Sequence, residues 1–335
     1  MVSNKIKLLI AISIIISIIL SIISANRNDN YFERNDTFAY KQQYTCLSLN
    51  NSSENCKQYI GSSKIEFGYD YTVELLSWFL GKDGFLFYKL IIALFINLTI
   101  FLCVGKLSGW NIVAIAVLLL DYRFYGFTNN TLRHGFALSL AMVSIYCSAK
   151  NKIKSSFLFY CASLGFHISA LSLFPFVKRK IKMKVFIAIF AVLLFFSNYF
   201  SIFIIDNKNL VELYLPKLLK YLNRDLSTGV LFPTGYLVVY LIGAYHYIKT
   251  NNSYLILIFN VISIVIFFGL IFSSINMMGR FISFLPPLMS ILVGIIWYEI
   301  KNKHKRFLFM TIVLCLWSIT FIRNLDVTLS FYSVG

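Results

Sequence analysis

Ten long apolar segments, separated by short polar stretches, constrain the fold of this chain more than any other feature of its sequence. They lie at residues 6–24, 86–105, 110–126, 132–149, 155–177, 185–205, 233–248, 253–275, 281–299 and 307–322. Several approach the ~20 apolar residues that an α-helix needs to cross the hydrocarbon core of a bilayer. Of the 335 residues, 58% are hydrophobic, which is more than a soluble domain can bury. We therefore expect an all-α polytopic integral membrane protein with nine or ten transmembrane helices, forming a single domain over residues 1–335.

Basic residues indicate which loops face the cytoplasm, because short cytoplasmic loops carry an excess of lysine and arginine. The net charge is +17, and the lysines cluster in runs between the apolar segments. This clustering is typical of the cytoplasmic loops of a membrane protein, so we do not interpret the positive charge as a sign of nucleic-acid binding. The runs at 5–7, 150–154, 178–184 and 301–306 should therefore lie on the cytoplasmic side, with residues 25–85 forming a large extracytoplasmic loop.

Only one apolar segment, residues 155–177, separates the basic runs at 150–154 and 178–184. If both runs face the cytoplasm, this segment enters and leaves the membrane on the same side. Such a re-entrant hairpin would turn near Gly165 and His167. A full crossing is the alternative, and it would invert everything downstream. We favour the hairpin, because it places more of the downstream basic residues on the cytoplasmic side.

Two longer polar stretches remain, at residues 25–85 and 206–232. The first contains Cys46 and Cys56, which could form a disulfide in an oxidising compartment or remain free. In the second, Leu and Tyr recur at helical spacing around Pro216. This pattern is typical of an amphipathic helix on the outer surface, although a plain solvated connector is the alternative.

Two arginines stand at the outer ends of apolar segments in the hairpin topology. Arg133 opens the segment 132–149, and Arg280 precedes the segment 281–299. A guanidinium cannot lose its charge at any working pH, so it must meet water, a partner or an anion. Snorkelling to the interface is the alternative for each arginine. Two guanidinium groups in one pocket would suit a diphosphate, whose oxygens they match bidentately.

Further polar residues converge on the same face. Tyr40 and Tyr69 could provide platforms and hydrogen bonds for sugar rings. Asp36, Glu66 or His167 could accept a proton from an attacking sugar hydroxyl. Alternatively, the two acids are ordinary loop residues and the histidine is a core residue bonded to a carbonyl.

The remaining charged and metal-ligating residues point to no cofactor. Asp121 and Arg123, near the end of the third apolar segment, are expected to steady the membrane boundary. The four histidines are scattered and no pair of aspartates marks a cation site, so we expect no metal.

Four short motifs occur in a recognisable order. They are "NDTFAYKQQY" with Asp36 and Tyr40, "IEFGYDYTVELLSWF" with Glu66, Gly68 and Tyr69, "LRHGFALSL" with Arg133, Gly135 and Ala137, and "GFHISALSLFP" with His167 and Ser169. This order resembles the EpsG family, which includes Wzy-type O-antigen and capsule polymerases. The likeness covers most of residues 25–180 and then thins to "GRFISFL" around Arg280. His134 stands where the family commonly has glutamine, so the resemblance implies no role for it.

The resemblance implies a membrane glycosyltransferase of GT-C-like architecture at the outer face of the bacterial inner membrane. Its donor would be an undecaprenyl-diphosphate-linked oligosaccharide, its acceptor a growing lipid-linked glycan, and a chain-length regulator would be a further candidate partner. The catalytic residues would be drawn from Arg133, His167, Asp36 and Glu66, and the substrate-binding residues from Arg133, Arg280, Tyr40 and Tyr69. An O-antigen ligase, which uses the same donor, and a transporter or flippase for the lipid-linked unit are the alternative functions.

Overall fold

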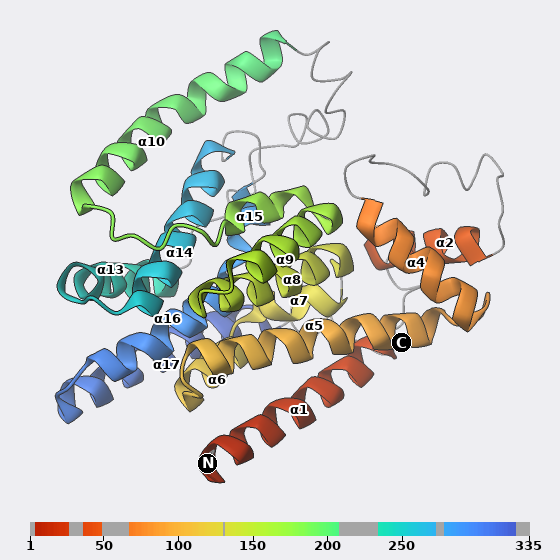
Figure 1. Ribbon diagram of the computed structural model, residues 1–335, viewed down its shortest axis with the longest axis horizontal. Helices are drawn as coiled ribbons and strands as arrows, with labels where there is room; N and C mark the ends of the chain where they lie inside the picture. The colour runs from red at the N-terminus through yellow and green to blue at the C-terminus, as the bar shows by residue number, and fades with distance from the viewer. Residues whose placement is uncertain are drawn as a thin grey trace.

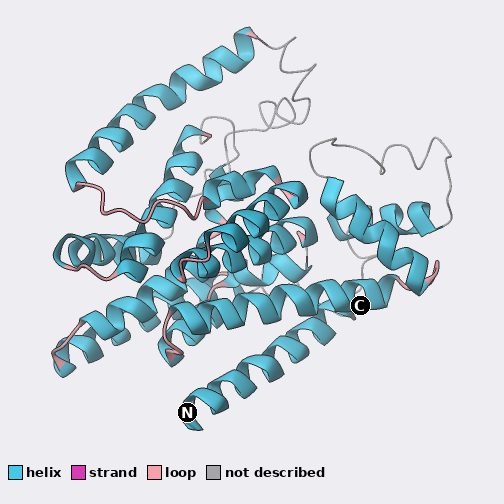
Figure 2. Ribbon diagram, in the orientation of Figure 1, coloured by secondary structure: helices cyan, strands magenta, loops and turns pink. Residues whose placement is uncertain are grey.

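The computed structural model describes residues 4–26, 36–48, 67–129, 131–207, 234–272 and 278–325. Throughout these ranges the regular structure is helical, which confirms the all-α prediction (Figure 2). Four of the described helices are long and apolar enough to cross a membrane: α1 (Asn4–Ala25), α5 (Phe85–Leu107), α14 (Ser253–Ile271) and α17 (Lys303–Arg323). The chain is therefore a polytopic membrane protein.

Most of the other helices follow the predicted apolar segments. They are α2 (Asp36–Ser48), α4 (Phe67–Leu80), α6 (Ile112–Leu119), α7 (Tyr122–Asn129), α8 (Leu132–Ala149), α9 (Ile153–Phe166), the 3-10 helix η2 (Ile168–Leu173), α10 (Met183–Asp206), α13 (Thr234–Lys249), α15 (Met278–Ile282) and α16 (Leu285–Glu299). The predicted loop 25–85 contains α2 and α4, which lie side by side near the start of α5 (Figure 1). The amphipathic helix predicted within 206–232 falls almost wholly outside the described residues.

The first helix, α1, packs along α5 through a row of small side chains. Ser17, Ser21 and Ser24 are fully buried at helical spacing, and such small residues let two membrane helices approach closely. Asn97 of α5 donates a hydrogen bond to Ser21 Oγ over 3.0 Å. The opposite face of α1 exposes isoleucines such as Ile15, as expected of a surface that faces lipid.

The third apolar segment is not one continuous helix. It is divided into α6 and α7, each of eight residues, with Asp121 between them. The Asp121 carboxylate accepts the backbone N–H of Arg123 over 3.2 Å, as an aspartate does when it caps the N-terminus of a helix. The aspartate therefore begins α7 at the point where α6 has ended.

The segment after α8 turns back on itself. His167 ends α9 in an extended conformation, with φ −157° and ψ 122°, and η2 follows directly. The chain then returns to the end of α8 from which α9 started. There Ser148 Oγ donates to the carbonyl of Pro175 over 2.6 Å, and Lys178 Nζ donates to Asn151 Oδ1 over 2.9 Å. Both arms of the segment thus end at one side of the bundle, as a re-entrant hairpin requires.

The lysine-rich loops gather at this same end of the bundle. Lys180 Nζ donates to the carbonyls of Ile248 and Thr250 over 2.6 and 2.9 Å. Asn252 Nδ2 in turn donates to Glu299 Oε1 over 2.7 Å. We call this side the lysine end, and it comprises the loops 150–152, 178–182, 250–252 and 300–302. Figure 1 places the start of α1 and the turn between α16 and α17 toward the same side.

The start of α5 lies at the opposite end. The Tyr298 hydroxyl donates to the carbonyl of Gly109 over 3.3 Å, which places the last turn of α5 near the lysine end. With 23 residues, α5 is ~34 Å long at the α-helical rise per residue. Its first turn, together with α2 and α4, therefore lies far from the lysine-rich loops (Figure 1).

Cysteine labelling provides a direct test of the hairpin. In a background with exposed Cys161 and Cys315 replaced by alanine, we expect Lys152→Cys and Arg179→Cys to react with a membrane-impermeant maleimide from the same side. Lys82→Cys, just before α5, should react from the other side and serves as the control. Labelling of positions 152 and 179 from opposite sides would show that the segment crosses the membrane.

Candidate active site

Arg133, in the first turn of α8, is held against two tyrosine rings. Its guanidinium carbon lies 5.7 Å from the ring centroid of Tyr40 in α2 and 5.6 Å from that of Tyr69 in α4. The two rings are 5.2 Å apart and are both buried. A guanidinium at this distance from an aromatic face is attracted by the negative face of the ring. We call these three residues the arginine–tyrosine cluster, and the side of the bundle that holds them the tyrosine end.

Polar contacts between α2 and α4 fix the two tyrosines in place. Gln43 Nε2 donates to Asp70 Oδ1 over 2.5 Å, directly beside Tyr69 in the sequence. One residue further along α2, the Tyr44 hydroxyl donates to the carbonyl of Gly81 over 2.7 Å. Burial raises the pKa of the Tyr69 hydroxyl well above its usual value, with neighbouring tyrosines adding to the increase. The phenol therefore stays protonated and can donate a hydrogen bond at any working pH.

Glycines of the second and third motifs allow close packing around the cluster. A Cβ atom at Gly68 would lie 3.1 Å from the carbonyl oxygen of Gly165 and from the ring of Phe166. The start of α4 thus rests on the tip of the re-entrant hairpin. A Cβ at Gly135 would lie 2.8 Å from the carbonyl oxygen of Phe127. The helices α7 and α8 can therefore pack this closely only because Gly135 has no side chain.

Two histidines meet beside the cluster. The rings of His134, in α8, and His167, at the hairpin tip, are 4.9 Å apart and nearly perpendicular. The His134 ring also stacks on Phe284 at 3.9 Å, with the two planes only 5° apart. Its Nε2 atom lies 2.7 Å from Ser283 Oγ. His167, which the sequence predicted as a site residue, thus forms a buried contact with His134, for which the sequence predicted no role.

The hydrogen bonds of His167 constrain its chemistry. Its Nδ1 atom lies 3.2 Å from the backbone nitrogen of Ser169 and 2.6 Å from the Oγ atom of the same residue. A backbone N–H can only donate, so Nδ1 acts as an acceptor here. The neutral ring therefore carries its proton on Nε2 and presents a hydrogen-bond donor there.

Arg280 joins this group through Ser283. Ser283 Oγ donates to the carbonyl oxygen of Arg280 over 2.7 Å, and Arg280 lies close enough to His134 for an electrostatic interaction. The structure thus links both predicted arginines to the first turn of α8. Sequence reasoning missed Ser283, whose only signal is its place three residues after Arg280 in "GRFISFLPP".

Neither of the two predicted carboxylate side chains lies within the described part of the structure. Asp36 is the first residue of α2, one helical turn before Tyr40, and its side chain lies outside the described part of the structure. Glu66 directly precedes α4 and also lies outside the described residues. Among the residues that are described, no group of three or more His, Cys, Asp or Glu side chains could hold a metal ion.

The first predicted loop contains a disulfide. Cys46, near the end of α2, is disulfide-bonded. Its predicted partner Cys56 lies outside the described residues.

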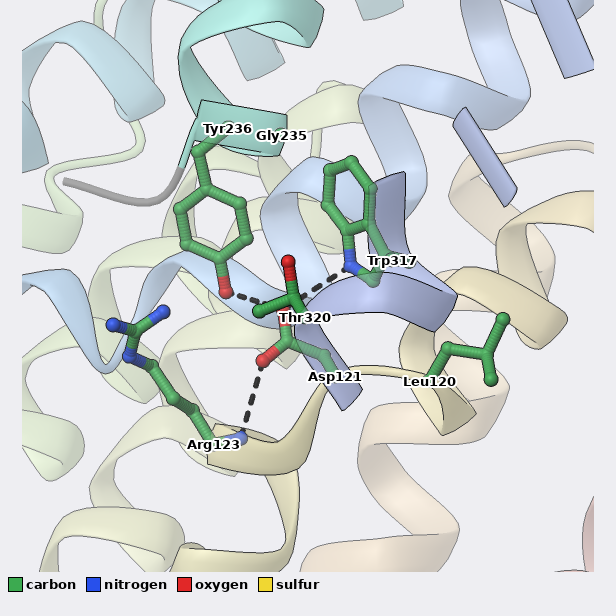
Figure 3. A pocket seen from close by; sticks show the side chains of 7 residues that line it. All are labelled: Leu120, Asp121, Arg123, Gly235, Tyr236, Trp317 and Thr320. Carbon is green, nitrogen blue, oxygen red and sulfur yellow. Dashed lines mark hydrogen bonds between the residues drawn. The ribbon is translucent and has the colours of Figure 1, made fainter. Parts of the chain in front are cut away.

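A second buried polar group surrounds Asp121 at the break between α6 and α7 (Figure 3). Its Oδ2 atom accepts hydrogen bonds from the hydroxyl of Tyr236 in α13 and, over 3.3 Å, from the indole N–H of Trp317 in α17. The guanidinium carbon of Arg123 lies 5.7 Å from the Tyr236 ring centroid. Asp121 thus ties the broken helix to two later helices.

Comparison with known proteins agrees with the motif order. The chain matches the model of the EpsG family over residues 10–332, which is nearly its whole length and extends well beyond the motifs in 25–180. No curated protein and no solved structure matches the chain significantly. EpsG is a family related to the Wzy-like polysaccharide polymerases. From this match, the chain belongs to the EpsG family.

Proposed function

We propose that this protein is a polysaccharide polymerase of the bacterial inner membrane. It transfers an oligosaccharide from undecaprenyl diphosphate onto a lipid-linked acceptor glycan. The observation that carries this proposal is the arginine–tyrosine cluster, in which a permanently charged group is held against two buried phenol rings at the end of the bundle opposite the lysine end. The match to a polymerase-related family supports the same reaction class.

The cluster faces the extracytoplasmic side in this proposal. Lysine-rich loops are retained in the cytoplasm, so the lysine end faces inward and the tyrosine end faces outward. The disulfide at Cys46, on the same helix as Tyr40, supports this orientation, because disulfides persist in oxidising compartments such as the periplasm.

The two arginines bind the diphosphate of the donor. Guanidinium groups match phosphate oxygens bidentately and keep their charge at any working pH. As the bond to the sugar breaks, negative charge builds on the departing diphosphate. Arg133 and Arg280 stabilise that charge, and because Arg133 is already held by Tyr40 and Tyr69, little reorganisation is needed when the reaction occurs.

His167 serves as a hydrogen-bond donor and a carboxylate serves as the base. With its Nδ1 atom engaged by Ser169, the neutral His167 ring offers Nε2–H to a phosphate or sugar oxygen. The proton of the attacking hydroxyl then passes to Asp36 or Glu66. The acceptor oxygen bonds to the anomeric carbon, and undecaprenyl diphosphate leaves with the electrons of the broken bond.

A strain that lacks this chain tests the proposed function. We expect surface polysaccharide with single repeat units attached in place of a ladder of long chains, because units are made and exported but not joined. Loss of every attached unit would instead identify a ligase. Accumulation of lipid-linked units on the cytoplasmic side would identify a flippase.

A further inference from the structure

We propose that His134 is a positioning residue that holds Arg280 beside Arg133, so that both arginines bind one diphosphate. The proposal rests on the proposed function for the identity of the ligand. It assigns a role to a residue for which neither the motifs nor the family resemblance implied one.

The first turn of α8 points two neighbouring side chains at different partners. Consecutive residues of an α-helix differ in direction by about 100°, because a turn contains 3.6 residues. Arg133 accordingly contacts Tyr40 and Tyr69 of α2 and α4. His134 contacts Ser283 and Phe284, which follow α15. A single turn of α8 therefore connects the element that carries Arg280 to the elements that hold Arg133.

The hydrogen bonds around Ser283 have a defined direction. A carbonyl oxygen can only accept, so the Ser283 hydroxyl donates its one hydrogen to the carbonyl of Arg280. The same hydroxyl oxygen must then accept from His134 Nε2, 2.7 Å away. The result is a chain from the His134 ring through the Ser283 hydroxyl to the backbone of Arg280 itself.

Other contacts of α15 do not replace this chain. This helix has only five residues, and its Phe281 ring packs at 5.8 Å from Phe268 and 5.2 Å from Phe272. Those contacts attach α15 to α14, and α15 also touches η2, whereas His134 links this segment to α8 itself. The His134 ring is itself confined by its stack on Phe284 and is only 6% exposed. Loss of the ring should therefore loosen Arg280 without unfolding α15.

Binding of undecaprenyl diphosphate to the full-length protein in nanodiscs provides the test. We expect His134→Ala to raise the Kd about tenfold, which corresponds to ~1.4 kcal/mol. His134→Gln should recover much of the affinity, because its amide N–H can still donate to Ser283. Ser283→Ala should weaken binding in the same direction as His134→Ala. The control is His304→Ala, which replaces an exposed histidine at the lysine end and should leave the Kd unchanged.

A double-mutant cycle separates positioning from a general structural effect. If His134 acts through Arg280, then His134→Ala should cost no further affinity in an Arg280→Ala background. The proposal would be overturned if His134→Ala costs the same affinity in both backgrounds, or if His134→Ala binds as tightly as wild type. It would also be overturned if the wild-type protein does not bind undecaprenyl diphosphate. The two proposals can also fail separately. If the cycle shows coupling between His134 and Arg280, but a strain that lacks the protein still makes a wild-type polysaccharide ladder, then only the polymerase function is refuted.

Discussion

Replacing Arg133 with alanine is expected to stop chain growth while the protein remains folded in the membrane. The substitution removes the guanidinium held against Tyr40 and Tyr69, and with it a preorganised positive charge at the leaving diphosphate. Removing one such group typically costs about 10²–10³ in rate. At that cost, the polysaccharide ladder should collapse to its shortest bands. Gel analysis of the surface polysaccharide measures the effect, and immunoblotting of membranes checks that the variant is present.

Arg133→Lys is the sharper probe of the same site. A lysine keeps the charge and loses both the planar fork that binds two phosphate oxygens and the flat surface that stacks on the tyrosines. We therefore expect a shortened ladder of intermediate length. Arg323→Ala, at the tyrosine end of α17, removes an exposed arginine and should leave the ladder unchanged. Wild-type ladder lengths from a well-expressed Arg133→Ala protein would contradict the assigned role.

The positions of the long helices could be predicted because membrane insertion depends on a property that the sequence displays directly. About 20 consecutive apolar residues are needed to cross a bilayer, and the ten apolar segments meet or approach that requirement. The hairpin was predictable for a similar reason: only one apolar segment lies between two lysine runs that must both be retained. The contacts of Pro175 and Lys178 bring the two ends of the segment together, as that prediction requires, and the labelling experiment tests on which side of the membrane they lie.

Features that depend on contacts between distant residues were less accessible. The helices α2 and α4 lie in a stretch that we interpreted as a loop, because they are short and α2 has few apolar residues. Their stability comes from pairs such as Gln43 with Asp70, which no local pattern indicates. The break at Asp121 was missed because its partners, Tyr236 and Trp317, lie far away in the sequence.

The candidate site was likewise predictable from the sequence only in part. The placement of Arg133 with Tyr40 and Tyr69 follows from chemistry that the sequence displays, since a charge near a membrane needs partners and tyrosines were abundant nearby. The contact of His134 with Ser283, 149 residues later, joins two residues of ordinary appearance. Only the folded structure brings them together, and the role proposed for His134 depends on that contact.

Asp121→Ala is expected to cause the largest loss of stability of any single substitution considered. Asp121 is buried between α7, α13 and α17, and its carboxylate accepts hydrogen bonds from Tyr236, Trp317 and the backbone of Arg123 (Figure 3). Removing one partner of a buried charged network typically costs about 3–5 kcal/mol, because the remaining polar groups cannot return to water. Asp121→Asn should cost less, since its amide oxygen can still accept one or two of these bonds. Thermal unfolding of the detergent-solubilised protein measures the loss, with Asp206→Ala, an exposed aspartate at the end of α10, as the control. If Asp121→Ala unfolds at the temperature of that control, the carboxylate does not hold the broken helix in place.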